Sequence, residues 1–407
     1  MAFSRLFLVL GWALILLPTS LWAREGTWAN VGMPGFSAGP ATYTSLVLNA
    51  AGVPYVAYKD DSRDGKASVM RFDGTNWNHV GIPGFSEGWA YFTSLALDPV
   101  GTPYVAYTDW DNGNGASVMR FDGTNWVHVG VPALSAGAAI YTSLALDDSG
   151  TPYLAYTDHA NSYKATVRMF DGIRWINVGP PGFTEGWAYF TSLALDPSGT
   201  PYVAYQDWGH DSKVSVMRFD GIRWLPVGML GFSAGEASHI SLKLDASRTP
   251  YVAYKDEAHG GKATVMKFDG RRWIPVGTQG FSEGQADDTS LTLNASGVPY
   301  VAYTDYANGL RATVMRLGNT DWEVVGTTGF SPGAVYFPSV ALDASGTPYL
   351  AYRSSANGDR ASVSMLGPLI TRPAIEMQTF LMVAGFVLVI IVVIAIMAYI
   401  GKRRLES

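Results

Sequence analysis

The chain has 407 residues, of which 48% are hydrophobic and 15% are charged, and its formal net charge is −6. It contains 45 glycines and 22 tyrosines but no cysteine, so disulfides, thiolate metal sites and a cysteine nucleophile are excluded. The negative charge argues against a nucleic-acid partner, which needs a basic surface. The apolar and aromatic content is too high for a disordered chain.

The first 23 residues have the pattern of a secretory signal peptide. Arg5 supplies the positive start, an apolar run covers 6–17, and Pro18 precedes a small residue at Ala23. This order of features predicts export and cleavage after residue 23. The alternative is a signal anchor that is not cleaved.

Residues 24–368 consist of one unit repeated seven times. The repeat is marked by a tryptophan every 49 residues, at Trp28, Trp77, Trp126, Trp175, Trp224, Trp273 and Trp322. In the second copy, four strands are expected at 93–98, 103–108, 116–121 and 126–130, separated by turns rich in glycine, proline and aspartate. Four short strands in a period of about 40–50 residues are typical of a β-propeller blade. We therefore predict an all-β fold, a seven-bladed β-propeller.

Side-chain size predicts the order of the strands in each blade. The small residues of 94–97 suit the crowded axis, whereas the tryptophan strand suits the wide outer edge. The seventh copy lacks a tryptophan strand of its own, and 26–32 provide a spare one before the first full copy. We expect this segment to complete the last blade and close the ring, which would leave no exposed sheet edge.

The C-terminal region has the pattern of a membrane anchor. A linker at 369–377 leads to 378–400, which carries no charge and would span about 34 Å as a helix. The tail at 401–407 contains Lys402, Arg403 and Arg404, which predicts a cytoplasmic C-terminus. The chain is thus expected to be a single-pass plasma-membrane protein with an extracellular propeller. A processed lipid-anchor signal or a sorting tail is the alternative.

The repeat resembles the family of seven-bladed propellers over 28–367. The turn at Asp73-Gly74-Thr75-Asn76-Trp77, which recurs in later copies, is similar to the Asp-box of sialidases, although its spacing differs. The aromatic-rich copies also resemble bacterial and fungal propeller lectins. The resemblance to lectins implies a ligand-binding face.

That face should be the one that carries the long connections, because binding residues gather on loops over a rigid scaffold. Aromatic residues and carboxylates stand together there, as a sugar ring requires. The candidate ligand-binding residues are Glu87, Trp89, Tyr91, Asp109 and Trp110 in the second copy, and Glu185, Trp187, Tyr189, Asp207 and Trp208 in the fourth. In the alternative interpretation, Trp89 and Trp187 pack between blades while Asp109 and Asp207 cap their own turns.

No motif in the sequence supports catalysis or a cofactor. The six histidines show no metal-binding spacing, and there is no nucleophile elbow or phosphate loop. A calcium loop at 60–65 is matched only in part, and later copies do not keep its oxygen ligands. We therefore expect no metal and no cofactor. The leading interpretation is a cell-surface binding or adhesion module for an extracellular glycan or surface protein. The alternatives are a structural scaffold without a small ligand and an extracellular glycoside hydrolase.

Overall fold

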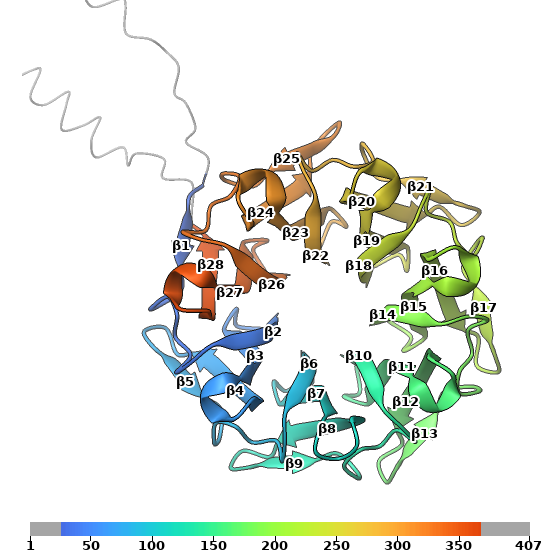
Figure 1. Cartoon of the computed structure of the whole chain (residues 1–407), viewed down its shortest axis with the longest axis horizontal. Helices are drawn as coiled ribbons and strands as arrows, with labels where there is room; N and C mark the ends of the chain where they lie inside the picture. The colour runs from blue at the N-terminus through green and yellow to red at the C-terminus, as the bar shows by residue number, and fades with distance from the viewer. Residues whose placement is uncertain (1–25, 368–407) are drawn as a thin grey trace, which may run out of the picture. The chain divides into compact units, whose positions relative to one another are not determined.

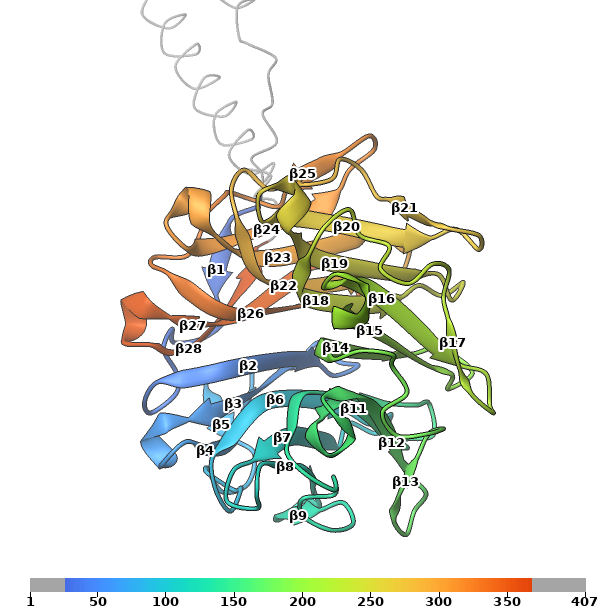
Figure 2. The same cartoon turned by 45° about the vertical axis from the view of Figure 1, so that its right-hand side comes forward.

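The computed structural model describes residues 26–367, which form seven antiparallel sheets of four strands each. The sheets are arranged as blades around a central axis (Figure 1), and an oblique view shows their inner strands converging on that axis (Figure 2). The protein is a seven-bladed β-propeller, as the 49-residue repeat predicts.

The innermost strand of each blade contains the small residues, as expected. These strands are β2 (Ala41–Leu48), β6 (Ala90–Leu97), β10 (Ala139–Leu146), β14 (Ala188–Leu195), β18 (Ala237–Leu244), β22 (Ala286–Leu293) and β26 (Val335–Leu342). Ser45 Oγ accepts a hydrogen bond of 3.0 Å from the backbone nitrogen of Leu95, and this bond recurs between every pair of neighbouring blades. A ring of hydrogen bonds therefore joins the blades around the axis.

The inner strands begin earlier than the sequence suggests. β6 starts at Ala90 rather than at residue 93, because a bulge between Tyr91 and Ser94 lets the strand continue past an irregular step. Phe92 in this bulge has a left-handed backbone with φ of 51°. The expectation from sequence missed the bulge because an extra residue breaks the two-residue alternation of a strand.

The second and third strands form the middle of each blade. The second strands are β3 (Pro54–Asp60), β7 (Pro103–Asp109), β11 (Pro152–Asp158), β15 (Pro201–Asp207), β19 (Pro250–Asp256), β23 (Pro299–Asp305) and β27 (Pro348–Ser354). The third strands are β4 (Lys66–Phe72), β8 (Gly115–Phe121), β12 (Lys164–Phe170), β16 (Lys213–Phe219), β20 (Lys262–Phe268), β24 (Arg311–Leu317) and β28 (Arg360–Leu366). Their side chains are buried on both sheet faces, so the hydrophobic core lies between blades rather than within one.

The outer strands are short and carry the repeated tryptophan. They are β1 (Trp28–Asn30), β5 (Trp77–His79), β9 (Trp126–His128), β13 (Trp175–Asn177), β17 (Trp224–Pro226), β21 (Trp273–Pro275) and β25 (Trp322–Val324). Trp126 stacks on Phe85 with ring centroids 4.1 Å apart, and its indole nitrogen donates a hydrogen bond of 2.7 Å to the carbonyl of Val80. The repeated tryptophan thus fastens each blade to the connection that precedes the next inner strand.

The ring is closed by the N-terminal strand. β1 pairs with β28, with Trp28 opposite Leu366 and Asn30 opposite Ser364. Figure 1 shows this blue strand beside the red strands of the last blade. The prediction that the segment around Trp28 completes the seventh blade is confirmed.

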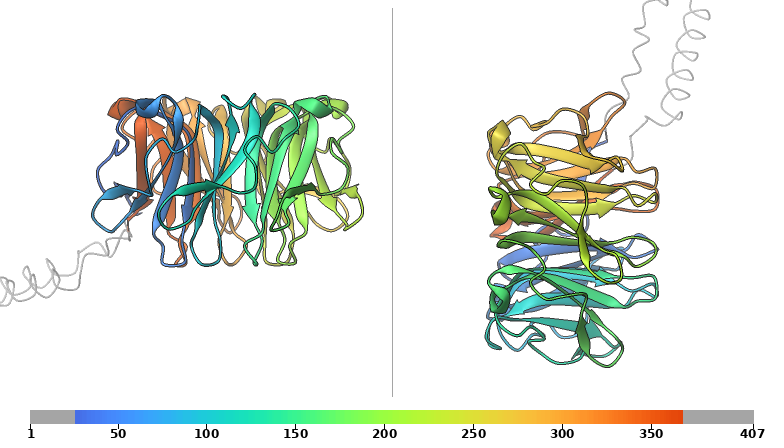
Figure 3. Two further views of the ribbon diagram at one scale, coloured as in Figure 1. Left: turned by 90° about the horizontal axis from the view of Figure 1, so that it is seen from below. Right: turned by 90° about the vertical axis from the view of Figure 1, so that its right-hand side faces the viewer.

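The two faces of the propeller differ, as the side views show (Figure 3). One face has only tight turns. The other, called the long-loop face, carries the connections between second and third strands. Six of these connections contain a 3-10 turn: η1 (Asp61–Arg63), η2 (His159–Asn161), η3 (Trp208–His210), η4 (Glu257–His259), η5 (Tyr306–Asn308) and η6 (Ser355–Asn357).

The predicted signal peptide and membrane anchor lie outside the described residues. Within 26–367, no helix has the length and apolar character needed to cross a bilayer.

Candidate functional site

The blades are numbered 1–7 by their inner strands β2, β6, β10, β14, β18, β22 and β26. The predicted aromatic residues of blade 2 come together on the long-loop face. Trp89 precedes β6, Tyr91 lies in it, and Trp110 follows β7. The ring centroids of Trp89 and Trp110 are 5.5 Å apart, and Tyr91 lies 6.2 Å from the first and 5.9 Å from the second. The indoles of Trp89 and Trp110 are 44% and 49% exposed. Blade 2 therefore offers a cluster of three aromatic rings to solvent.

Blade 4 repeats this cluster at the equivalent positions. Trp187 and Trp208 lie 5.2 Å apart with an interplanar angle of 37°, and Tyr189 lies 5.8 Å from Trp208. The two indoles are 43% and 49% exposed. Tyr163, from the neighbouring blade, extends the cluster at 5.5 Å from Trp187. We call the two sets of Trp, Tyr and Trp the aromatic triads.

In the alternative interpretation, the tryptophans pack between blades and the aspartates cap their turns. The structure differs from the first part and agrees with the second. Trp89 and Trp187 do not pack inside the blade interfaces, because nearly half of each side chain faces solvent. Asp109 and Asp207, by contrast, are fully buried. Asp207 accepts hydrogen bonds from Gly209 N at 3.0 Å and from Ser215 Oγ at 2.7 Å. These carboxylates hold their turns together and do not reach the surface, so they do not belong with the exposed candidates.

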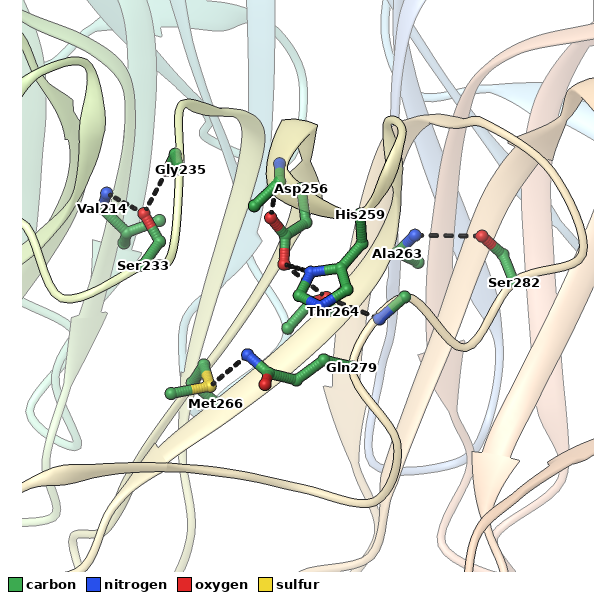
Figure 4. Close-up of polar contacts among 12 residues, drawn as sticks. Val214, Ser233, Gly235, Asp256, His259, Ala263, Thr264, Met266, Gln279 and Ser282 are labelled. Atoms are coloured by element: carbon green, nitrogen blue, oxygen red, sulfur yellow. Dashed lines mark hydrogen bonds and ion pairs between the residues drawn. The ribbon is translucent and has the colours of Figure 1, made fainter.

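The same buried carboxylate recurs in other blades. Figure 4 shows it in blade 5, where Asp256 lies among His259, Thr264 and the backbone of the 3-10 turn. Asp256 Oδ2 accepts a hydrogen bond from Thr264 Oγ1 and lies 2.8 Å from His259 Nδ1. In blade 1, Asp60 is likewise buried and accepts from Ser62 N and from Ser68 Oγ. The turn that partly matched a calcium loop thus uses this carboxylate within the protein.

The two predicted glutamates are exposed on the long-loop face. Glu87 accepts a hydrogen bond of 3.0 Å from the side chain of Asn112 and lies 3.9 Å from His128. This contact places a carboxylate at the turn that carries Trp110. Glu185 is exposed beside Trp187. Each aromatic triad therefore has a carboxylate next to it in the chain, with oxygen atoms that are able to accept from a ligand.

A ring of side chains that the sequence analysis did not combine lines the mouth of the central channel. It comes from the bulge of each inner strand and consists of Tyr43, Phe92, Tyr141, Phe190, His239, Asp288 and Phe337. Neighbouring aromatic rings lie 4.7–4.9 Å apart. All seven residues have φ of 50–54°, so the unusual backbone belongs to the repeat and marks no single blade.

Blades 5 and 6 interrupt this ring with a polar pair. His239 Nδ1 lies 3.0 Å from Asp288, whose other oxygen accepts from the backbone nitrogen of Phe337. The ring lines an open depression of about 250 Å³. Comparison of the seven copies at this repeat position would have shown that His239 and Asp288 replace the aromatic residue of the other five copies. The sequence analysis did not use this position because its predicted inner strand began one residue later.

Metal ligands were not predicted, and among residues 26–367 no three His, Asp or Glu side chains form a group that could hold a metal ion.

No protein-family model matches the chain, and no curated protein matches it. Solved structures with a similar fold include AofleA from Arthrobotrys oligospora, with 12% identity, 74% of this chain and 90% of that chain covered, and a TM-score of 0.50. The Aleuria aurantia lectin AAL aligns with 16% identity, 74% and 100% coverage and a TM-score of 0.47. Penicillium chrysogenum α-L-arabinanase aligns with 12% identity, 85% and 99% coverage and a TM-score of 0.48. The likeness to AofleA concerns the fold alone.

Proposed function

We propose that the protein is a cell-surface module that binds glycans through the aromatic triads of blades 2 and 4. The observation that carries the proposal is the recurrence of an exposed Trp, Tyr and Trp cluster at equivalent positions of two blades. Exposed aromatic side chains that gather on one face are a common feature of binding surfaces. Their flat faces suit the C–H face of a pyranose ring.

The fold does not require these aromatic residues. The backbone bond from Trp110 N to Trp89 O measures 3.1 Å, and blades 1 and 3 make the same bond with other residues. There, Asp61 N bonds to Pro40 O and His159 N bonds to Ala138 O, each at 3.0 Å. Since the turn forms equally well without tryptophan, structural need does not account for the triads.

Polar groups near the blade 2 triad supply partners for sugar hydroxyls. Glu87 offers carboxylate oxygens, and Asn112 offers an amide. Lys59, from blade 1, has its ammonium 5.7 Å from the Tyr91 ring centroid. A flat apolar surface with a few directed polar groups is the usual composition of a carbohydrate-sized site.

In this proposal the propeller is held outside the cell. Residues 1–23 direct export, 378–400 span the plasma membrane, and 401–407 lie in the cytoplasm. The expected partner is an extracellular glycan, free or attached to a surface protein, and the protein serves in adhesion or recognition.

Binding is tested with the full-length chain in a detergent that has no sugar headgroup, applied to a glycan array. We expect the double variant Trp110→Ala/Trp208→Ala to lose about fivefold in affinity at each triad, because each stacking contact contributes about 1 kcal/mol. Ile222→Ala, which removes an even more exposed apolar side chain (85%) from the tight-turn face, is the control. Unchanged binding by the double variant would reject the triads as the site.

The same incubations separate the alternatives. If the wild-type chain bound no glycan on the array, the result would favour a scaffold without a small ligand. New reducing ends released from a polysaccharide would favour a glycoside hydrolase. Asp287 and Asp288 beside the channel mouth would then be the first carboxylates to replace, since two carboxylates carry out that reaction.

A further inference from the structure

Alternate repeats of the propeller share a feature that the others lack. Before the inner strand, blades 2, 4 and 6 carry Glu87, Glu185 and Glu283, whereas blades 1, 3 and 5 carry alanine at this position. In blades 2 and 4, a glycine and the first tryptophan of the triad follow. In blade 6, the residue after the glycine is Gln285. Blade 6 therefore belongs to the same set as the two triad blades but has different side chains.

The backbone and packing of blade 6 match those of blade 2. Tyr306 N bonds to Gln285 O at 3.1 Å, the same bond that joins Trp110 to Trp89. A Cβ added to Gly261 would lie 2.9 Å from Lys255 Cε and 3.2 Å from Gln285 Cγ.

The equivalent glycine between blades 1 and 2 has the same surroundings. A Cβ on Gly65 would lie 2.9 Å from Lys59 Cε and 3.1 Å from Trp89 Cδ1. The boundary between blades 5 and 6 is thus built like the boundary between blades 1 and 2. Gln285 takes the place of Trp89 there.

Polar contacts replace aromatic contacts at the remaining positions. Lys255 Nζ lies 2.9 Å from Asp287, which stands where Tyr91 stands in blade 2. Tyr306, in the place of Trp110, donates a hydrogen bond of 2.8 Å to Asp287 Oδ2 and is 46% exposed. Lys255 also lies 3.5 Å from Glu257. A carboxylate, an ammonium and an exposed phenol therefore meet at one point on the long-loop face.

This arrangement is not required to join two blades. Arg353 occupies the position of Lys255 in blade 7 and pairs with Asp359 of its own blade. Blade 1, which follows, has Thr42 in the position of Asp287. The interface between those blades is made without an ion pair across it at this position.

We propose that Lys255, Asp287 and Tyr306 form a third saccharide site, which selects a pyranose unit by hydrogen bonds to its hydroxyl groups. The inference rests on the proposed function and adds a second kind of specificity to it. Asp287 accepts a hydrogen bond from one hydroxyl group of the sugar, and Lys255 donates a hydrogen bond to the adjacent hydroxyl group. The sugar ring lies against Tyr306.

The charges at this site are stable at neutral pH. Burial acts to raise the pKa of Asp287, but the hydrogen bonds from Lys255 and Tyr306 outweigh it, so the pKa lies below its ordinary value. Burial likewise acts to lower the pKa of Lys255, and the contact with Asp287 outweighs it, so that pKa is raised. The donor and the acceptor keep these roles across the physiological range.

The two kinds of site should discriminate sugars differently. A site that hydrogen-bonds a hydroxyl group rejects the analogue that lacks it, because the protein groups are then left without partners. The triads hold a sugar mainly by stacking, and the carboxylates beside them, Glu87 and Glu185, are exposed and stay hydrated when a hydroxyl group is missing, so the triads tolerate a deoxy sugar better. Removal of the triads should therefore leave a protein that prefers fully hydroxylated pyranosides.

The experiment uses the full-length Trp110→Ala/Trp208→Ala chain in sugar-free detergent. Its probes are the methyl α-D-glycosides of glucose, galactose and mannose, and methyl α-D-fucoside, which is the galactoside without its 6-hydroxyl group. Affinities are measured by titration with saturation-transfer NMR. We expect one or more D-glycosides to bind and the fucoside to bind at least about tenfold more weakly, the loss expected for one unmade hydrogen bond to a charged group.

Two further substitutions, each made in that double variant, locate the binding. Lys255→Met and Tyr306→Ala should each weaken it at least about tenfold. Arg353→Met, at the matching position of blade 7, should not change it. Thermal unfolding midpoints check that each variant is folded, and Tyr306→Ala provides the answer if Lys255→Met does not fold.

The outcomes separate this inference from the proposed function. If the wild-type chain binds glycans and the double tryptophan variant binds none, the triads act alone and the third site is rejected. Unchanged binding after both Lys255→Met and Tyr306→Ala also rejects it. A wild-type chain that binds no saccharide at all overturns both proposals.

Discussion

Adjacent residues on the long-loop face have opposite environments. Asp207 is fully buried, whereas Trp208, the next residue, is 49% exposed. The carboxylate is held by the donors of its own turn, and the indole begins the 3-10 turn that the carboxylate caps. The sequence predicted this turn but did not separate the two roles, since an aspartate at the end of a strand can either cap the turn or face a ligand.

Loss of a capping carboxylate should destabilise its blade. In Asp207→Ala, Gly209 N and Ser215 Oγ lose their acceptor in a buried place, so we expect a loss of about 2–3 kcal/mol. The measurement is the thermal unfolding midpoint. Asp211→Asn is the matched control, because that carboxylate is 90% exposed, lies in the same turn, and asparagine tolerates the left-handed backbone (φ 56°) at this position. Equal midpoints for the two variants would contradict the structural role assigned to Asp207.

At the scale of strands and turns, the sequence predicted the regular parts well. The tryptophan spacing and the turn residues placed four strands in every copy, and the second, third and outer strands follow that prediction to within two residues. The inner strand was the exception, because its bulge and left-handed residue have no simple pattern. The residues at the channel mouth lie in this bulge, so the sequence analysis did not combine them into one ring.

The closing strand is held mainly by its tryptophan. Trp28 stacks on Phe330 at 4.2 Å and donates a hydrogen bond of 2.8 Å to the carbonyl of Val325. β1 has only three residues, so its backbone pairing alone is weak. We expect Trp28→Ala to cost about 3 kcal/mol, as for other large-to-small changes in packed sites.

Limited proteolysis and thermal unfolding test this prediction. Trp28→Ala should expose β28 to cleavage, because the last blade would lose its outer strand and leave an edge. Met33→Ala, which changes a 75% exposed side chain a few residues away, should not do so. Protection of β28 equal to that of the wild type would show that the ring closes without this contact.

At the scale of the whole molecule, repetition decides what could be predicted. A ring of equal blades follows from seven copies of one unit, so fold and closure were accessible from the sequence alone. Specific sites depend on the positions where copies differ. The triads were found because tryptophan is conspicuous, whereas Lys255 and Asp287 were missed because charged residues are ordinary at a surface, and Tyr306 was not linked to them. They stand out only when the copies are compared, because Asp287 and Tyr306 occupy the repeat positions of Tyr91 and Trp110 in the blade 2 triad.

The repeat also places a buried tyrosine in every blade, and these tyrosines predict how the propeller unfolds at alkaline pH. The seven are Tyr58, Tyr107, Tyr156, Tyr205, Tyr254, Tyr303 and Tyr352, and none is more than 2% exposed. Burial raises the pKa of each above its ordinary value. In the folded protein they stay neutral, while in the unfolded chain they ionise near pH 10.

The unfolded state therefore binds fewer protons above pH 10, and stability falls as the pH rises. Each tyrosine contributes about 1.4 kcal/mol per pH unit, so seven together contribute about 10 kcal/mol per unit. We expect one steep transition, in which tyrosinate absorbance near 295 nm appears together with loss of the β-sheet circular dichroism signal. If all tyrosines ionised gradually while the sheet signal stayed intact, the buried set would not be held as the structure shows.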